Sequence, residues 1–185
     1  MDSSAIIIYG SIYGSARTYA LELGRRTGIR VVDSKERPAP GCYDTVVYIG
    51  SLYAGGMTGL EKTFRSWDRK DDRTRIFIAS VGIADPSKED NCEHIRSSLA
   101  GQLPAGVYRT ARFFHLRGCL DYQLLSFRHK AMMWMLVRMI SGRRAKDMSD
   151  EDRQIVETYG KRVDFTDFDG LDPLVRALAE PYHQA

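Results

Sequence analysis

The chain has 185 residues, is 43% hydrophobic and carries a formal net charge of +3, which excludes a disordered or collagen-like protein and allows one sizeable core. Its start has a short apolar run without a basic flank, so we expect no secretory signal, and no run of 18 apolar residues predicts a membrane span. Three widely spaced cysteines and four scattered histidines predict neither a disulfide framework nor a metal site. We therefore expect one cytoplasmic domain over residues 1–185, bound at most to the inner face of a membrane.

Apolar runs alternate with helical patterns along the chain, as in parallel strands joined by helical crossovers. The expected strands span residues 5–9, 29–33, 45–50, 75–80 and 106–116. The expected helices span residues 17–26, 59–68, 88–100, 121–141 and 149–163, the last with Ser149 as its N-cap. Near-continuous valine and isoleucine in the strands indicate burial on both faces. The pattern predicts a doubly wound, five-stranded parallel α/β sheet with helices on both faces, which binds ligands at the carboxyl ends of its strands.

The stretch GSIYGSA, residues 10–16, joins the first expected strand to the first helix and is called loop 1 below. Its backbone N–H groups and the start of the helix favour an anion such as phosphate, and Ser11 and Ser15 add hydroxyl donors. Gly14 allows a tight turn and a close approach of the ligand. The loop is neither a Walker A nor a G-x-G-x-x-G motif. An ordinary strand-to-helix turn with serine caps is the alternative interpretation.

Two further loops follow the third and fourth expected strands. They are loop 2, GSLYAGGMTG at residues 50–59, and loop 3, SVGIADP at residues 80–86. Both contain glycine, and loop 2 also carries Tyr53, whose flat ring suits stacking on a ligand. Three such loops at one edge of a sheet, with a phosphate site in the first, predict a mononucleotide with a planar ring.

Four segments of the chain resemble the flavodoxin family, and within it the branch that contains menaquinone-linked protoporphyrinogen oxidases. They are YGSIYGSARTYA, IGSLYAGGM, the basic and aromatic segment before MISG, and ETYGKRVDFTDFDGLDPLV. The resemblance implies a flavodoxin-like fold and noncovalent FMN, with the phosphate in loop 1, the isoalloxazine ring between loops 2 and 3, and Gly55 and Gly56 near flavin N5. Ala16 departs from the family, which usually has a hydroxyl residue there, so one phosphate hydrogen bond is missing.

The residues expected to bind the cofactor lie in the three loops. They are Ser11, Ile12, Tyr13, Gly14, Ser15, Ala16, Ser51, Leu52, Tyr53, Ala54, Gly55, Gly56, Ser80, Val81, Gly82 and Ile83. The resemblance implies that the redox chemistry belongs to the flavin, so we assign no catalytic side chain and no metal ligand.

Residues 112–146 contain eight basic residues and one acidic residue, so this region alone has a net charge of +7. A basic and apolar helical segment is expected at about residues 117–146, and within it the apolar run 131–137 has basic residues on both sides. The run is too short and too charged to span a bilayer. It fits either a helix that covers the sheet or a helix that lies on an anionic membrane surface.

The sequence leaves three functions open. The first is an FMN redox protein that passes electrons between partners or reduces a small acceptor such as a quinone. The second, implied by the resemblance, is the oxidation of protoporphyrinogen coupled to menaquinone in haem biosynthesis. The third is nucleic-acid binding, which we do not expect because no nucleic-acid motif accompanies the basic segment. The oligomeric state is not predicted.

Overall fold

The computed structural model describes residues 4–53, 56–65, 67, 74–142, 144, 148 and 150–180. Its strands are β1 (Ala5–Gly10), β2 (Arg30–Asp33), β3 (Thr45–Tyr53), β4 (Gly56–Met57), β5 (Arg75–Gly82), β6 (Arg112–Arg117), β7 (Cys119–Asp121) and β8 (Arg162–Asp164). Its α-helices are α1 (Ser15–Thr27), α2 (Leu60–Phe64), α3 (Glu89–Leu99), α4 (Ala105–Thr110), α5 (Phe127–Ser141), α6 (Asp150–Thr158) and α7 (Asp172–Ala179). Short 3-10 helices include η1 (Ser34–Glu36), η2 (Pro40–Cys42), η3 (Ala100–Gln102) and η5 (Phe168–Leu171).

Five parallel strands form the central sheet in the order β2-β1-β3-β5-β6, which confirms the doubly wound sheet predicted from the sequence. In addition, the short strand β4 pairs antiparallel with the end of β3. The strands β1, β3 and β5 are neighbours and run in the same direction, so loops 1, 2 and 3 leave the sheet at one edge. This edge is where an open α/β sheet binds its ligand.

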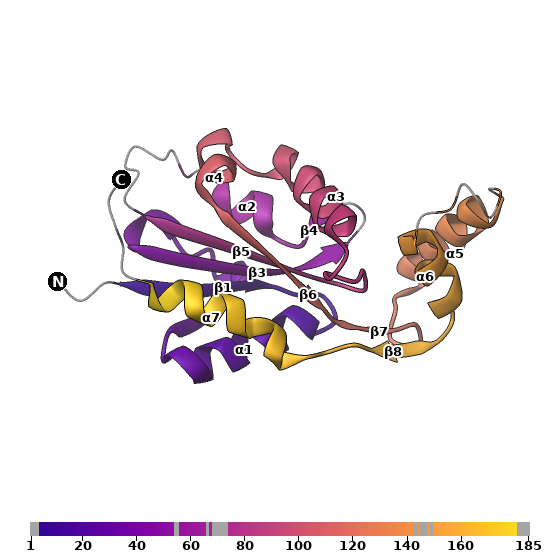
Figure 1. Ribbon diagram of the computed structural model, residues 1–185, viewed down its shortest axis with the longest axis horizontal. Coiled ribbons are helices and arrows are strands. Elements are labelled where there is room, and N and C mark those ends of the chain that lie inside the picture. Colours follow the sequence, from indigo (N-terminus) through magenta and orange to yellow (C-terminus); the bar gives the residue numbers. More distant parts are fainter. Residues whose placement is uncertain are drawn as a thin grey trace.

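Hydrophobic layers lie on both faces of the sheet because successive residues of a strand point to opposite sides. Ile7 and Phe77 pack in the layer with α1 and α7, whereas Ile8 and Ile78 pack in the layer with α2, α3 and α4. Figure 1 shows the same division of the helices between the two faces. All four side chains are buried, so the helices on both faces confirm the two-sided burial expected from the sequence.

The predicted fifth strand, residues 106–116, is wrong in its first half. This half is helix α4, which begins after Pro104, and only the second half belongs to β6. Val107 and Ala111 lie four residues apart and are both buried on the α3 side of the sheet. The apolar residues there have the spacing of a helix face and not the alternation of a strand.

The other helices differ from the predictions mainly at their ends. α1 and α3 lie where helices were expected. Residues 66 and 68, at the end of the expected second helix, and the expected N-cap Ser149 lie outside the described residues. α7 was not predicted, although it begins with an Asp172–Pro173 pair that is typical of a helix start. In the part of the chain that the structure describes, no helix has the length and apolarity needed to cross a bilayer.

Between β6 and α7 the chain leaves the sheet and forms an arm, residues 118–165, whose stem is the antiparallel pair β7–β8 and whose end carries α5 and α6 (Figure 1). The helix expected over 121–141 begins only at α5. Before it, Asp121 accepts a hydrogen bond from the Gln123 N–H at 2.8 Å, and Ser126 then caps the helix. Among the described residues α5 packs chiefly against α6, so it does not cover the sheet.

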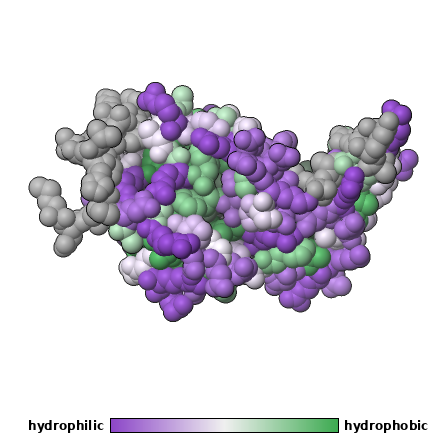
Figure 2. Space-filling view, in the orientation of Figure 1, coloured by the Kyte–Doolittle hydropathy of each residue, from purple (hydrophilic) through white to green (hydrophobic). Residues whose placement is uncertain are grey.

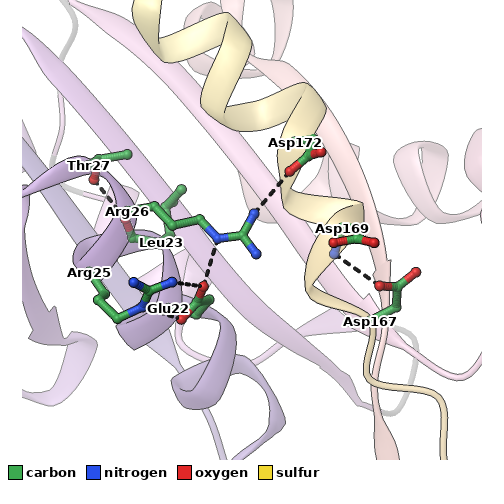
Figure 3. Close-up of polar contacts among 8 residues, drawn as sticks. All are labelled: Glu22, Leu23, Arg25, Arg26, Thr27, Asp167, Asp169 and Asp172. Atoms are coloured by element: carbon green, nitrogen blue, oxygen red, sulfur yellow. Dashed lines mark hydrogen bonds and ion pairs between the residues drawn. The ribbon is translucent and has the colours of Figure 1, made fainter.

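Charged side chains join the two helices on one face, α1 and α7 (Figure 3). Arg26 donates to Glu22 in its own helix at 2.7 Å and to Asp172 at the start of α7 at 3.0 Å. Hydrogen bonds from Arg25 and Arg26 lower the pKa of Glu22 from 4.5 to about 2. Because the folded pKa is the lower one, this carboxylate stabilises the fold above pH 4.5 and loses that contribution as the pH falls towards 2.

We expect Gly10, the last residue of β1, to accept no side chain. A Cβ atom there would lie 1.9 Å from the carbonyl oxygen of Thr58 and 2.6 Å from the hydroxyl of Tyr48. These two groups are themselves hydrogen-bonded at 2.6 Å, so neither can move away freely. Gly10→Ala is therefore expected to lower the free energy of unfolding by about 1–3 kcal/mol, measured by urea denaturation.

Gly106→Ala is the matched control. Gly106 lies in α4, and a Cβ atom there would meet nothing within 4 Å. Alanine favours a helix over glycine, so we expect this variant to be as stable as the wild type or more stable by up to about 1 kcal/mol. Equal free energies of unfolding for the two variants would contradict the close approach at Gly10.

Candidate functional site

Loop 1 turns from β1 into α1 at Gly14, which has a left-handed backbone with φ of 99° and is the N-cap of the helix without any side-chain cap. The serine-capped turn considered from the sequence is therefore wrong. The first turn of α1 contains no acidic residue, and no described group accepts a hydrogen bond from the backbone N–H groups of Ser15, Ala16 and Arg17. These N–H groups lie at the positive end of the helix dipole and suit an anion.

The hydroxyl groups of loop 1 hold the loop in place. Ser11 Oγ accepts a hydrogen bond from the Gly14 N–H at 3.0 Å. Ser15 Oγ donates to the Cys119 carbonyl at 3.1 Å and accepts from the Cys119 N–H at 3.3 Å. The Ser15 proton is thus already donated within the protein, and loop 1 offers the backbone N–H groups at the start of α1 to a ligand. Ala16, at the position where a hydroxyl residue was expected from the resemblance, has a fully buried methyl group that packs in the core.

A cavity of about 580 Å³ lies where the three loops meet. Nine of the residues expected to bind the cofactor line it, namely Tyr13, Ser15, Ser51, Leu52, Tyr53, Gly56, Val81, Gly82 and Ile83. The lining is mostly apolar, and the volume is within the range of sites for small organic ligands. The structure thus brings together residues from all three loops at one end of the sheet.

The other expected residues do not line the cavity or are not described. Ser11, Ile12, Gly14 and Ala16 belong to loop 1 but do not line the cavity, and Ala54 and Gly55 lie outside the described residues. Ser80 is buried, and its hydroxyl is hydrogen-bonded to His115 Nδ1 at 2.7 Å. Burial, with Arg96 nearby, lowers the pKa of His115 and favours a neutral ring. The Ser80 side chain therefore has a structural partner in place of a ligand.

The remaining walls come from elements that sequence reasoning did not connect with the site. α3 contributes His94, Ile95 and Ser98, the stem contributes Gly118, Cys119 and Leu120, α5 contributes His129, Met132, Met133, Met135, Leu136 and Met139, and α6 contributes Ile155. The methionines of α5 were visible in the sequence at helical spacing, which is the signal that was missed. Methionine fits irregular apolar surfaces because its side chain is flexible and polarisable.

One aromatic cluster joins α5 to loops 1 and 2. The hydroxyl of Tyr13 is hydrogen-bonded to His129 Nδ1 and accepts from the Ser126 N–H at 3.2 Å. The centres of the Tyr53 and His129 rings lie 4.4 Å apart. The Tyr53 hydroxyl donates to Met132 Sδ at 3.8 Å. Burial raises the pKa of Tyr53, so this phenol is neutral at physiological pH. Flat aromatic surfaces therefore border the cavity next to the anion site.

The three cysteines are free thiols, and the described residues contain no cluster of histidine, cysteine and carboxylate side chains that could hold a metal ion. Burial raises the pKa of Cys119, which lines the cavity and is therefore protonated at neutral pH. The site thus offers backbone N–H groups, apolar walls and aromatic rings, which suit an organic anion with a planar group.

Comparison with known proteins gives the family. Residues 6–147 match the family model described as flavodoxin domain. No curated protein sequence matches the chain. Solved structures similar to the chain include a flavodoxin mutant from Pseudomonas aeruginosa, which is 17% identical with a TM-score of 0.37. The match covers 73% of this chain and 95% of that one.

Two further solved structures have similar scores. A WrbA-like flavodoxin from Agrobacterium tumefaciens is 14% identical with a TM-score of 0.38 over 95% of this chain and 99% of that one. A flavoprotein from Lactobacillus acidophilus, solved in complex with FMN, is 9% identical with a TM-score of 0.39. The match covers 62% of this chain and 92% of that one. The family match itself covers most of the sequence, from β1 to beyond α5. The chain therefore belongs to the flavodoxin-domain family.

Proposed function

We propose that this protein is a flavodoxin-like redox protein that binds FMN noncovalently where loops 1, 2 and 3 meet. The observation that carries the proposal is the turn at Gly14, which presents the backbone N–H groups of Ser15, Ala16 and Arg17 without an acidic residue in the first turn of the helix. This anion site lies beside an apolar cavity with an aromatic wall. One anion site next to one such cavity fits a mononucleotide with a large planar ring.

Each part of the site has one task in this proposal. Loop 1 holds the phosphate through its backbone N–H groups, and Tyr53 and Gly82 flank the ring from loops 2 and 3. Gly56, with its neighbour Gly55, is the candidate for backbone contacts near flavin N5. The apolar side chains of α5 exclude water from the ring. When bound, the flavin supplies the electron-transfer chemistry.

The lining of the cavity favours an apolar electron acceptor or a redox partner that contacts the rim. Met132, Met133 and Leu136 face the cavity from α5, and they offer no charged group to bind a polar substrate. A quinone is one small acceptor of this kind. Oxidation of protoporphyrinogen coupled to menaquinone is the second candidate function, and the same methionine-rich wall favours it because the macrocycle of the tetrapyrrole is large and apolar.

We expect the purified protein to carry FMN and not FAD or NAD. Loop 1 has N–H donors for one terminal phosphate, and the described lining of the cavity contains no arginine or lysine that could bind a second phosphate. The chromophore released by heat is identified by anion-exchange chromatography. FAD as the main species recovered would contradict the proposal.

Gly14→Val is expected to weaken FMN binding far more than Ser15→Ala. A branched residue is strained at φ of 99°, and its side chain extends into open space where the phosphate approaches, because no protein atom lies within 4 Å of a Cβ atom there. Loss of the Ser15 hydroxyl breaks only the link to Cys119. We expect the Kd to rise about a hundredfold or more for Gly14→Val and about fivefold for Ser15→Ala.

Fluorescence titration of the apoprotein with FMN ranks the two variants, and circular dichroism controls for folding. Similar dissociation constants for both variants and the wild type would place the phosphate elsewhere.

The outer face of α5 is proposed to contact an anionic membrane. Phe127 and Trp134 are 87% and 54% exposed, and Arg128 and Arg138 are exposed on the same helix. The guanidinium of Arg138 lies 5.4 Å from the centre of the Trp134 ring. Figure 2 shows hydrophobic and strongly hydrophilic side chains side by side at this end of the molecule. Exposed aromatic and basic residues on one helix are typical of binding at a lipid headgroup surface.

We expect the wild type to sediment with anionic liposomes at low salt and to be released as salt is raised. Changing Arg128, Lys130 and Arg138 together to glutamine removes about 1 kcal/mol of lipid attraction per residue, so sedimentation should be lost while the flavin spectrum is unchanged.

The matched control changes the exposed residues Arg30, Lys35 and Lys62, on or near the sheet, to glutamine, which alters the net charge equally. The same loss of sedimentation in this control, or no sedimentation of the wild type at low salt, would contradict a specific role of α5.

A further inference from the structure

Little buried surface holds α5 beside the cavity. Among its described residues only Ile140 is buried, whereas most of its length is half-buried or exposed. The chief neighbour of α5 is α6, which belongs to the same arm, and the arm is joined to the sheet through the β7–β8 stem (Figure 1). The position of α5 relative to the cavity therefore depends on a small number of specific contacts.

Those contacts come from two of the loops that form the proposed FMN site. The Tyr13 hydroxyl has one proton to donate, and Nδ1 of a neutral His129 can accept it. The same hydroxyl oxygen accepts the Ser126 N–H at 3.2 Å, at the N-cap of α5. Tyr53 adds its ring contact with His129 and its bond to Met132. Loop 1 and loop 2 thus hold the first turns of α5 in place.

Tyr13 also lies next to the residue that shapes the anion site. It directly precedes Gly14, whose left-handed backbone presents the N–H groups of loop 1. A ligand bound to these N–H groups would restrain the backbone of Tyr13, and the Tyr13 hydroxyl connects this residue to α5. α5 in turn forms one wall of the cavity.

We propose that the bond between Tyr13 and His129 is a latch that couples occupation of loop 1 to closure of α5 over the cavity. The identity of the ligand, FMN, rests on the proposed function. Tyr13 and His129 are positioning residues, since they hold the wall of the site. Breaking the latch leaves the backbone donors of loop 1 intact, so FMN associates at a similar rate but dissociates faster.

The test compares Tyr13→Phe, His129→Ala and the double variant by the rate of FMN dissociation, followed by the return of flavin fluorescence on dilution. Each single variant should release FMN about tenfold faster than the wild type. The double variant should release FMN more slowly than the product of the two single effects predicts, because both changes remove the bond between Tyr13 and His129. An unchanged rate for Tyr13→Phe, or additive effects in the double variant, would overturn the latch.

Tyr159→Phe is the matched control. Tyr159 is 36% exposed, close to the 38% of Tyr13, and packs on Tyr122 away from the cavity. Loss of its hydroxyl should leave the rate of FMN dissociation unchanged. A rate as fast as that of Tyr13→Phe would show that any exposed tyrosine hydroxyl has this effect, and would overturn the latch.

A second measurement needs no FMN. Arg128, Lys130 and Arg138 are trypsin sites on α5 and are exposed. Without the latch α5 leaves its position more often, so the Tyr13→Phe apoprotein should be cut in α5 several-fold faster than the wild type. If the wild type binds no FMN, the proposed function fails, and cleavage alone decides the latch. Equal cleavage rates would then overturn it.

Discussion

The left-handed backbone of Gly14 is the constraint on which the rest of the site depends. Residues with a Cβ atom rarely adopt a φ of 99°, and at Gly14 this conformation turns the chain from β1 into α1 within a few residues. The free N–H groups of the helix therefore lie at the edge of the sheet. Because β3 lies between β1 and β5, the loops that follow these strands end at the same edge. As a consequence of this strand order, the proposed anion site lies at the same edge of the sheet as the apolar cavity and its aromatic wall.

The hydroxyl groups around this turn hold neighbouring parts of the structure in place. Ser11 holds the turn at Gly14, Ser15 holds the stem of the arm at Cys119, and Tyr13 holds the start of α5. Loop 1 is thus both the proposed phosphate site and the attachment point of the arm. α5 itself has little buried surface, and Phe127 and Trp134 are exposed on its outer face.

The sheet and the three loops could be predicted because continuous apolar runs and glycine-rich loops are local signals of burial and of turns. The walls formed by α3 and α5 could not, because their contacts join distant parts of the chain. Tyr13 and His129 lie 116 positions apart, and Ser15 and Cys119 lie 104 apart, so no local pattern marks these partners. The error at α4 was of another kind, since the helical spacing of Val107 and Ala111 was overlooked beside the apolar strand that follows.

Amide chemical shifts test most directly whether the N–H groups at the start of α1 bind the phosphate of FMN. The apoprotein is titrated with FMN and, separately, with riboflavin, which has the same ring without the phosphate. We predict that the difference between the two ¹H–¹⁵N spectra is largest at the amides of Ser15, Ala16 and Arg17. Identical shifts of these amides with both ligands, or a maximum of the difference outside loop 1, would contradict the proposed site.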